Sequence, residues 1–181
     1  MISIPSPNRV ARVYSPPDRV AARPLPISIG SQDMNKDAQI SALADFIAEV
    51  ERLNAATRQA EDRQIYGMYL ARVAIILSKV IRDEPIGDDI ASMERLFGNT
   101  WLKDEHAYRE AYSTWDRFKG LLIESIQGMT VNERLFNLGL LDQFDDAAAR
   151  GDKVQLRSVL FKCFLEKDNI EAVVNKYLKR E

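Results

Sequence analysis

Six of the seven prolines of this 181-residue chain lie within its first 26 residues, and the only later one is Pro85. Proline fixes its own φ, lacks an amide donor and drives the residue before it towards extended conformations. The spacing of these six prolines therefore opposes a helix or a central strand near the N-terminus. The distribution divides the chain into an arm, residues 1–33, and a longer region, residues 34–181, whose pattern is almost entirely helical.

The arm is rich in arginine as well as proline, and we expect it to be extended and poorly ordered. Three interpretations remain open. The favoured one is a flexible tail, or an upstream extension of a reading frame whose natural start is Met34, because disorder concentrates at termini. The second is a docking segment that becomes ordered on a partner. The third is a targeting peptide, but the prolines oppose the amphipathic helix that such peptides need.

Charge is unevenly distributed along the chain. The arm has a formal net charge of +2, and residues 34–181 have −4. A mildly acidic region lacks the basic patch with which proteins bind DNA or RNA, so we expect no nucleic acid partner. Opposite charge accelerates association, and an acidic region therefore favours a basic protein partner.

Cysteine content and hydropathy limit the compartment. The single cysteine, Cys163, cannot form an internal disulfide, and nothing indicates an extracellular disulfide-built fold. The longest uncharged apolar run, residues 73–77, is far too short to cross a bilayer. The N-terminus lacks the apolar segment of a secretory signal. We therefore expect a cytoplasmic location and no membrane partner.

Residues 34–128 show apolar side chains at helical spacing. A first stripe runs from Ile40 to Leu53, and the polar stretch 54–64 is either a connection or an exposed part of one continuous helix. Residues 65–81 are apolar over most of the helical circumference, which predicts the central helix of the domain. Asp88 and Asp89 begin a short helix, with acids near its positive end.

The stretch 101–122 is the most distinctive. Asp104 is the expected N-cap of a helix whose apolar residues repeat at spacings of three and four, which predicts bundle packing. These residues are Tyr108, Ala111, Trp115, Phe118 and Leu122. We favour the interpretation that this aromatic stripe is core. The alternative is a binding face made of Trp101, Tyr108, Tyr112 and Trp115, because exposed tryptophan and tyrosine are favoured at interfaces.

Residues 129–181 contain four short helical segments, at about 131–138, 140–150, 153–165 and 169–179. Capping boxes start three of them, at Thr130, Asp152 and Asp168, and Gly139 and Gly151 stand where helices stop. Each segment is too short to be stable alone, so they must pack together. The predicted fold class is all-α: a bundle of about four longer helices, residues 34–128, plus a C-terminal module of short capped helices, residues 129–181.

Candidate catalytic groups are few. The only histidine, His106, lies in a polar first turn and is expected at the surface, and Cys163 lies in an apolar run and is expected in the core. One histidine and one cysteine cannot build an ordinary zinc site. Nucleotide-binding glycine motifs are also missing. We therefore expect no catalytic residues, no cofactor and no metal.

Three functional hypotheses follow. The favoured one is a non-enzymatic interaction protein, an inhibitor or immunity-type bacterial protein that masks a basic partner such as a toxin. The second is a regulatory or adaptor subunit that docks through its arm. The third is a metal-dependent enzyme that uses Asp142, Asp145 and Asp146, which share one helical face. The candidate partner-binding residues are Trp101, Asp104, Glu105, Tyr112, Asp142, Asp145 and Asp146.

Overall fold

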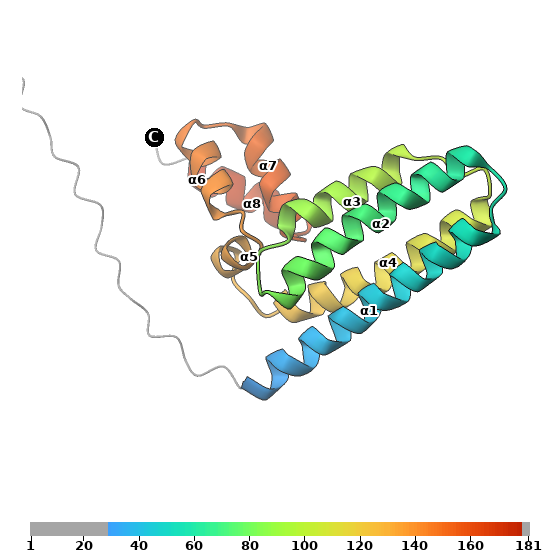
Figure 1. The fold of residues 1–181 in the computed structure, drawn as a ribbon. Coiled ribbons are helices and arrows are strands. Elements are labelled where there is room, and N and C mark those ends of the chain that lie inside the picture. The colour runs from blue at the N-terminus through green and yellow to red at the C-terminus, as the bar shows by residue number, and fades with distance from the viewer. Residues whose placement is uncertain (1–28, 179–181) are drawn as a thin grey trace, which may run out of the picture.

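The computed structural model describes the backbone of residues 29–178 and the side chains of residues 35–177. Within this part of the chain every regular element is an α-helix, so the predicted all-α class is confirmed. Eight helices follow one another from α1 to α8 (Figure 1). Residues 1–28, most of the predicted arm, lie outside the described residues.

Helix α1 (Ile29–Ala56) begins five residues before Met34, where the sequence pattern placed the start of the helical region. Proline restricts itself and the residue before it, so the influence of the N-terminal prolines ends at Pro26. The residues that follow Pro26 are free to become helical, although charge and composition group them with the arm.

The connection between α1 and α2 (Ala60–Ile81) is only three residues long, 57–59. The Thr57 hydroxyl accepts a hydrogen bond from the backbone N–H of Gln59 at 3.2 Å. The Arg63 guanidinium donates to the Thr57 carbonyl oxygen at 3.0 Å, which satisfies a backbone group freed at the helix end. The stretch 54–64 is therefore helical at both ends and a connection only in its middle.

The N-terminal helices, α1 to α4, enclose one apolar cluster. Helix α1 packs against α2 and α4 (Glu105–Ile126), and α2 also packs against α3 (Gly87–Asn99). Phe97 lies among aromatic rings from three other helices: its ring stacks on Tyr69 at a centroid distance of 4.4 Å and lies 6.2 Å from Phe46 and 6.4 Å from Trp115. The predicted stripe of α4 is core, because Ala111, Trp115, Phe118 and Leu122 are buried and Tyr108 is half-buried.

Helix α2 is not surrounded by other helices, and the prediction that it is the central helix was wrong. One face is buried, whereas Met68, Ile75 and Ile81 are 39%, 52% and 53% exposed. The helix packs mainly against α1 and α3, so a sequence that is apolar on all sides leaves one side in solvent. Among the described helices, only α2 is long and apolar enough to cross a membrane. Length and composition are the only criteria here, and the core helices of other proteins meet them too.

The C-terminal helices, α5 (Val131–Asn137), α6 (Leu141–Ala149), α7 (Lys153–Lys162) and α8 (Lys167–Leu178), enclose a second apolar cluster. Thr130 and Glu133 form the predicted capping box of α5, and Asp152 caps α7 by accepting from the N–H of Gln155 at 3.0 Å. The box predicted at Asp168 does not form. Helix α8 begins two residues earlier than predicted, at Lys167, so Asp168 lies inside the helix, and Glu171 instead binds Arg157 at 2.6 Å.

The two sets of helices meet where α3 begins. The backbone N–H of Gly87 donates to the carbonyl oxygen of Leu138 at 3.2 Å, and α3 also contacts α7. Leu138 directly follows α5, so the start of α3 is hydrogen-bonded to the C-terminal helices. Figure 1 shows these helices gathered at one end of the longer ones.

Candidate protein-binding surfaces

Trp101 lies in the connection between α3 and α4 and is 88% exposed, more than any other large apolar side chain of the described residues. The residues around it are fixed. The Thr100 hydroxyl bonds the Tyr69 hydroxyl at 2.8 Å, Leu102 is buried, and the backbone N–H of Lys103 donates to the buried Asp62 carboxylate at 3.3 Å. A rigid connection therefore holds the indole in solvent, where an aromatic side chain is well placed to anchor a partner.

Asp104 and Glu105, the two predicted acidic contacts beside Trp101, differ in their structural roles. Asp104 caps α4, as predicted, because its carboxylate accepts from the backbone N–H groups of His106 at 2.9 Å and Ala107 at 3.2 Å. Glu105 is largely exposed, and its carboxylate lies 3.5 Å from the Arg109 guanidinium. Glu105 is thus available to a partner, whereas Asp104 has a structural function that explains its presence.

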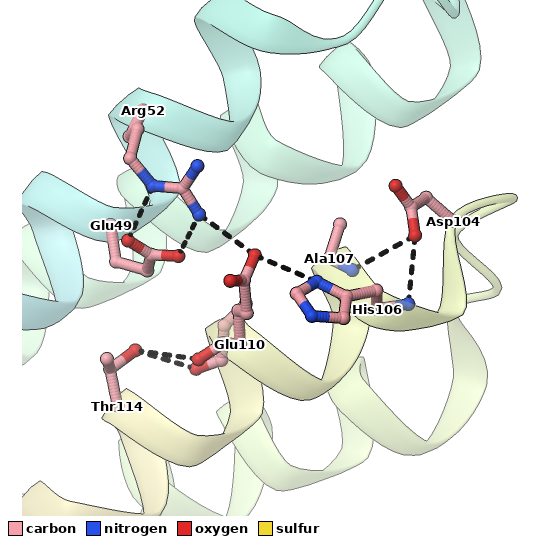
Figure 2. A network of polar contacts seen from close by, with 8 residues as sticks. Glu49, Arg52, Asp104, His106, Ala107, Glu110 and Thr114 are labelled. Carbon is pink, nitrogen blue, oxygen red and sulfur yellow. Dashed lines mark hydrogen bonds and ion pairs between the residues drawn. The ribbon is translucent and has the colours of Figure 1, made fainter.

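A polar network next to this connection ties α4 to α1 (Figure 2). Arg52 on α1 donates to Glu49 at 2.6 Å and to Glu110 on α4 at 2.9 Å, and these hydrogen bonds raise the pKa of Arg52. The hydrogen bond from Arg52 in turn lowers the pKa of Glu49. His106 is exposed, as predicted, and its Nδ1 lies 3.4 Å from Glu110. The acids of this network are occupied by Arg52, so it serves to join two helices.

Tyr112 is only half-exposed, whereas the binding-face hypothesis requires an exposed ring. Its ring stacks on Tyr108 with an interplanar angle of 4° and meets the edge of Phe97 at 5.2 Å. Lys119 donates to its hydroxyl at 3.2 Å. Burial lowers the pKa of Lys119, but hydrogen bonds to Tyr112 and Asp116 outweigh this effect and the pKa is raised overall. Of the aromatic residues in 101–118, only Trp101 lies fully at the surface.

Asp142, Asp145 and Asp146 form the exposed side of α6, opposite its buried residues Phe144 and Ala147. Among the described residues, none of the three carboxylates has a basic partner within 4.0 Å. No group of three or more acids, histidines or cysteines in this part of the chain is arranged to hold a metal ion. The three carboxylates therefore form a solvated acidic surface.

The predicted partner-binding residues do not form one continuous surface. Trp101, Asp104 and Glu105 lie at the end of α3 and the start of α4, and Tyr112 lies two turns further along α4. The three aspartates lie on α6, among the C-terminal helices at the opposite end of the molecule (Figure 1). Sequence spacing groups residues within one helix, but the separation between helices depends on the tertiary packing.

Cys163 is fully buried at the end of α7, as predicted. Burial raises the pKa of its thiol to about 11, and the charges of Arg134 and Lys162 offset this only in part. A nucleophilic cysteine needs a lowered pKa and access to solvent. Cys163 has neither property in this structure.

An apolar groove on α7 and α8 was missed by the sequence analysis. Its volume is about 540 Å³, and it is lined by Val154, Arg157, Ser158, Phe161, Leu165, Lys167, Ile170 and Glu171. Val154 and Phe161 are largely exposed although both are apolar. They are seven residues apart and lie off the buried stripe of α7, and this spacing is the signal that could have revealed them.

Comparison of the chain with models of known protein families, with curated proteins and with solved structures gave no match. The surfaces described above are therefore the basis for a functional proposal. They include one exposed tryptophan, one acidic helix face, one apolar groove and the uncovered side of α2.

Proposed function

We propose that this chain is a non-enzymatic interaction protein, which acts in the bacterial cytoplasm and inhibits a basic protein partner such as a toxin. In this proposal a bundle of four longer helices, α1 to α4, supports a module of short capped helices, and α6 of that module makes the main contact. The closest electrostatic match for its acidic face is a basic surface, such as the substrate-binding face of a nuclease.

The observation that carries the proposal is the contrast between α6 and the neighbouring acids. Asp88 and Asp89 at the start of α3 are held by Lys162 at 2.8 Å and by Lys79 at 2.6 Å. The exposed aspartates of α6, by contrast, have no such partner within the described chain, and α6 contains no basic residue. Like charges along one helix face repel each other. A basic partner would relieve that repulsion.

Trp101 supports a second contact of the same or another partner. An exposed tryptophan on a rigid connection is a typical anchor residue, and Glu105 beside it would favour a basic neighbour. Because this surface lies away from α6, it is tested separately, by Trp101→Ala.

The test compares two variants of equal net charge. One reverses the α6 carboxylates (Asp142→Lys, Asp145→Lys, Asp146→Lys), and the control reverses three exposed acids elsewhere (Glu51→Lys, Glu124→Lys, Glu166→Lys). The wild-type chain is used to capture a stoichiometric basic partner from its native host, and titration calorimetry gives the affinity of each variant. We expect the α6 variant to bind at least about 100-fold more weakly and the control to bind within about threefold of wild type. Equal affinity of the two variants, with circular dichroism unchanged, would contradict the proposal.

A regulatory or adaptor subunit that docks through its N-terminal arm is the second candidate. One observation favours it: a groove of about 760 Å³ lies beside Asn35, Lys36 and Gln39 in the N-terminal half of α1. It is lined by Lys36, Glu84, Ser125, Met129 and Asn137, among others. Removal of residues 1–28 distinguishes the candidates, because the inhibitor would keep its partner and the adaptor would lose it.

A further inference from the structure

The uncovered side of α2 carries apolar and small residues along most of its length. Its exposed members between the charged ends of the helix are Gln64, Gly67, Met68, Ala71, Ala74, Ile75, Ser78 and Ile81. The only charged residues within the same stretch, Arg72 and Lys79, are half-buried, and Lys79 binds Asp89 at 2.6 Å. A connected face of mostly apolar and small residues is typical of an interaction surface.

Two parallel rows of exposed residues follow this side. Glu61, Met68, Ile75 and Arg82 recur at intervals of seven, and Gln64, Ala71 and Ser78 form a second row three residues further on. Two such rows form the seam along which paired helices pack in coiled coils. We name the five central residues Gln64, Met68, Ala71, Ile75 and Ser78 the α2 seam.

We propose that the α2 seam pairs with the α2 seam of a second copy of this chain, in antiparallel orientation. Antiparallel seams set a residue of one row against a residue of the other row. Ile75 then lies against Ala71 of the second copy, and Met68 lies against Ser78 of the second copy. Each large side chain meets a small one, which allows close packing, and two-fold symmetry repeats both contacts.

The charges on α2 argue against a strongly charged partner and against a bilayer. The seam is uncharged, so a strongly basic or acidic face would lose hydration against it without gaining an ion pair. A bilayer would have to accommodate Arg72 and Lys79. The antiparallel pairing instead brings Arg82 close to Gln64 and Glu61 of the second copy, and it sets the two helix dipoles antiparallel to each other, which is favourable.

This pairing is independent of the proposed function. The seam belongs to α2, whereas the exposed aspartates belong to α6, so each copy in the dimer keeps its acidic surface free. Binding of a basic partner and self-association can therefore be measured separately.

The first experiment measures the mass of the full chain by light scattering and sedimentation over a range of concentrations. We expect a dimer for wild type. Ala71→Glu should raise the dimer dissociation constant at least about tenfold, because it places a charge against Ile75 of the second copy. The matched control is Ala48→Glu, at an exposed alanine of α1 outside the seam, and it should leave the dissociation constant unchanged. Circular dichroism verifies that both variants are folded.

The second experiment tests the register. Chains with Ala71→Lys and chains with Ile75→Glu should each be monomeric alone and should form a heterodimer when mixed, because the new lysine and glutamate then face each other. A wild-type chain that stays monomeric at every concentration would overturn the proposal. So would equal dissociation constants for Ala71→Glu and Ala48→Glu, or a mixture of the two charged variants that remains monomeric.

Discussion

The Lys162 ammonium on α7 lies 2.8 Å from the Asp88 carboxylate at the start of α3, and this ion pair joins the C-terminal helices to the N-terminal ones. Gln143 on α6 donates a hydrogen bond to the same carboxylate at 2.7 Å. Three helices that belong to two apolar clusters therefore meet at one acid. Lys162 is mostly buried and Asp88 is more than half exposed, so solvent screens the pair on one side only.

Asp88→Asn should lower the free energy of unfolding by about 0.5–1 kcal/mol, because the partly exposed ion pair with Lys162 is lost while the size and shape of the side chain are kept. The loss should shrink in high salt. Asp37→Asn, at an exposed acid of α1, is the control and should have no measurable effect. Urea denaturation at low and high salt gives both values.

The same carboxylate makes stability depend on pH. Burial raises the pKa of Asp88, but hydrogen bonds from Lys162 and Gln143 outweigh it, and the pKa is lowered overall. A lowered folded-state pKa means that the contribution is complete above the unfolded value, about 4, and is lost as pH falls through the folded value. Asp88→Asn should therefore matter less at acid pH than at pH 7. An equal effect at both would show that the pair does not form.

Gly87→Ala should destabilise the protein by about 1–3 kcal/mol, because an added Cβ would lie 2.6 Å from the Leu138 carbonyl oxygen and 3.0 Å from the Leu138 Cβ. Gly98→Ala on the same helix meets nothing within 4 Å and should be neutral or stabilising by up to about 1 kcal/mol. Thermal unfolding of the two variants measures the difference. If they unfold at the same temperature, α3 and Leu138 are not in contact.

Sequence analysis succeeded where the determining interactions are local. Asp104 and Thr130 cap their helices as predicted, and Gly139 and Gly151 have φ of 69° and 64°, which glycine adopts without strain. Cap chemistry depends on residues three or four positions apart, so the pattern contains the necessary information. The core stripe of α4 was predicted for the same reason.

The exposed surfaces required tertiary information. Trp101 and Trp115 have similar sequence surroundings, yet one is in solvent and the other is fully buried. The difference arises because α4 begins after Trp101 and turns only Trp115 towards α1 and α3. In α2 the number of neighbouring helices decides whether Ile75 is covered. A periodic pattern identifies apolar faces but does not count the helices that cover them.

Trp115→Phe should cost about 1–3 kcal/mol, whereas Trp101→Phe should change stability by less than about 0.5 kcal/mol. The Trp115 Nε1–H donates to Glu94, and the smaller ring would leave a void and remove this hydrogen bond, although Lys119 still donates to Glu94 at 3.2 Å. Acrylamide quenching separates the two residues, because only Trp101 is accessible. If Trp101→Phe keeps the quenchable fluorescence, Trp115 must be exposed in solution.

Cys163 should not react with Ellman's reagent at about pH 8 in the folded protein and should react fully in denaturant. Burial raises its pKa to about 11, so little thiolate exists, and the thiol is inaccessible as well. The labelling rate then reports how often the C-terminal helices open. Gly87→Ala, which disturbs their junction with α3, should label faster than Gly98→Ala, and equal rates would indicate that the junction does not govern opening.

Two buried tyrosines should weaken the fold at alkaline pH. Burial raises the pKa of Tyr66 and of Tyr69 to about 12. The unfolded chain releases these protons near pH 10, so a folded state that retains them is fully stable below about pH 10 and loses stability as pH rises towards 12. Tyr69→Phe removes one of the two ionisable groups and should flatten the decline, although it also removes the 2.8 Å hydrogen bond to Thr100. Tyr177→Phe, at a surface ring of α8, is the control. Two measurements test this prediction: urea denaturation between about pH 8 and 11, and the tyrosinate absorbance of the folded chain. Uniform ionisation of all tyrosines near pH 10 would contradict the buried positions of Tyr66 and Tyr69.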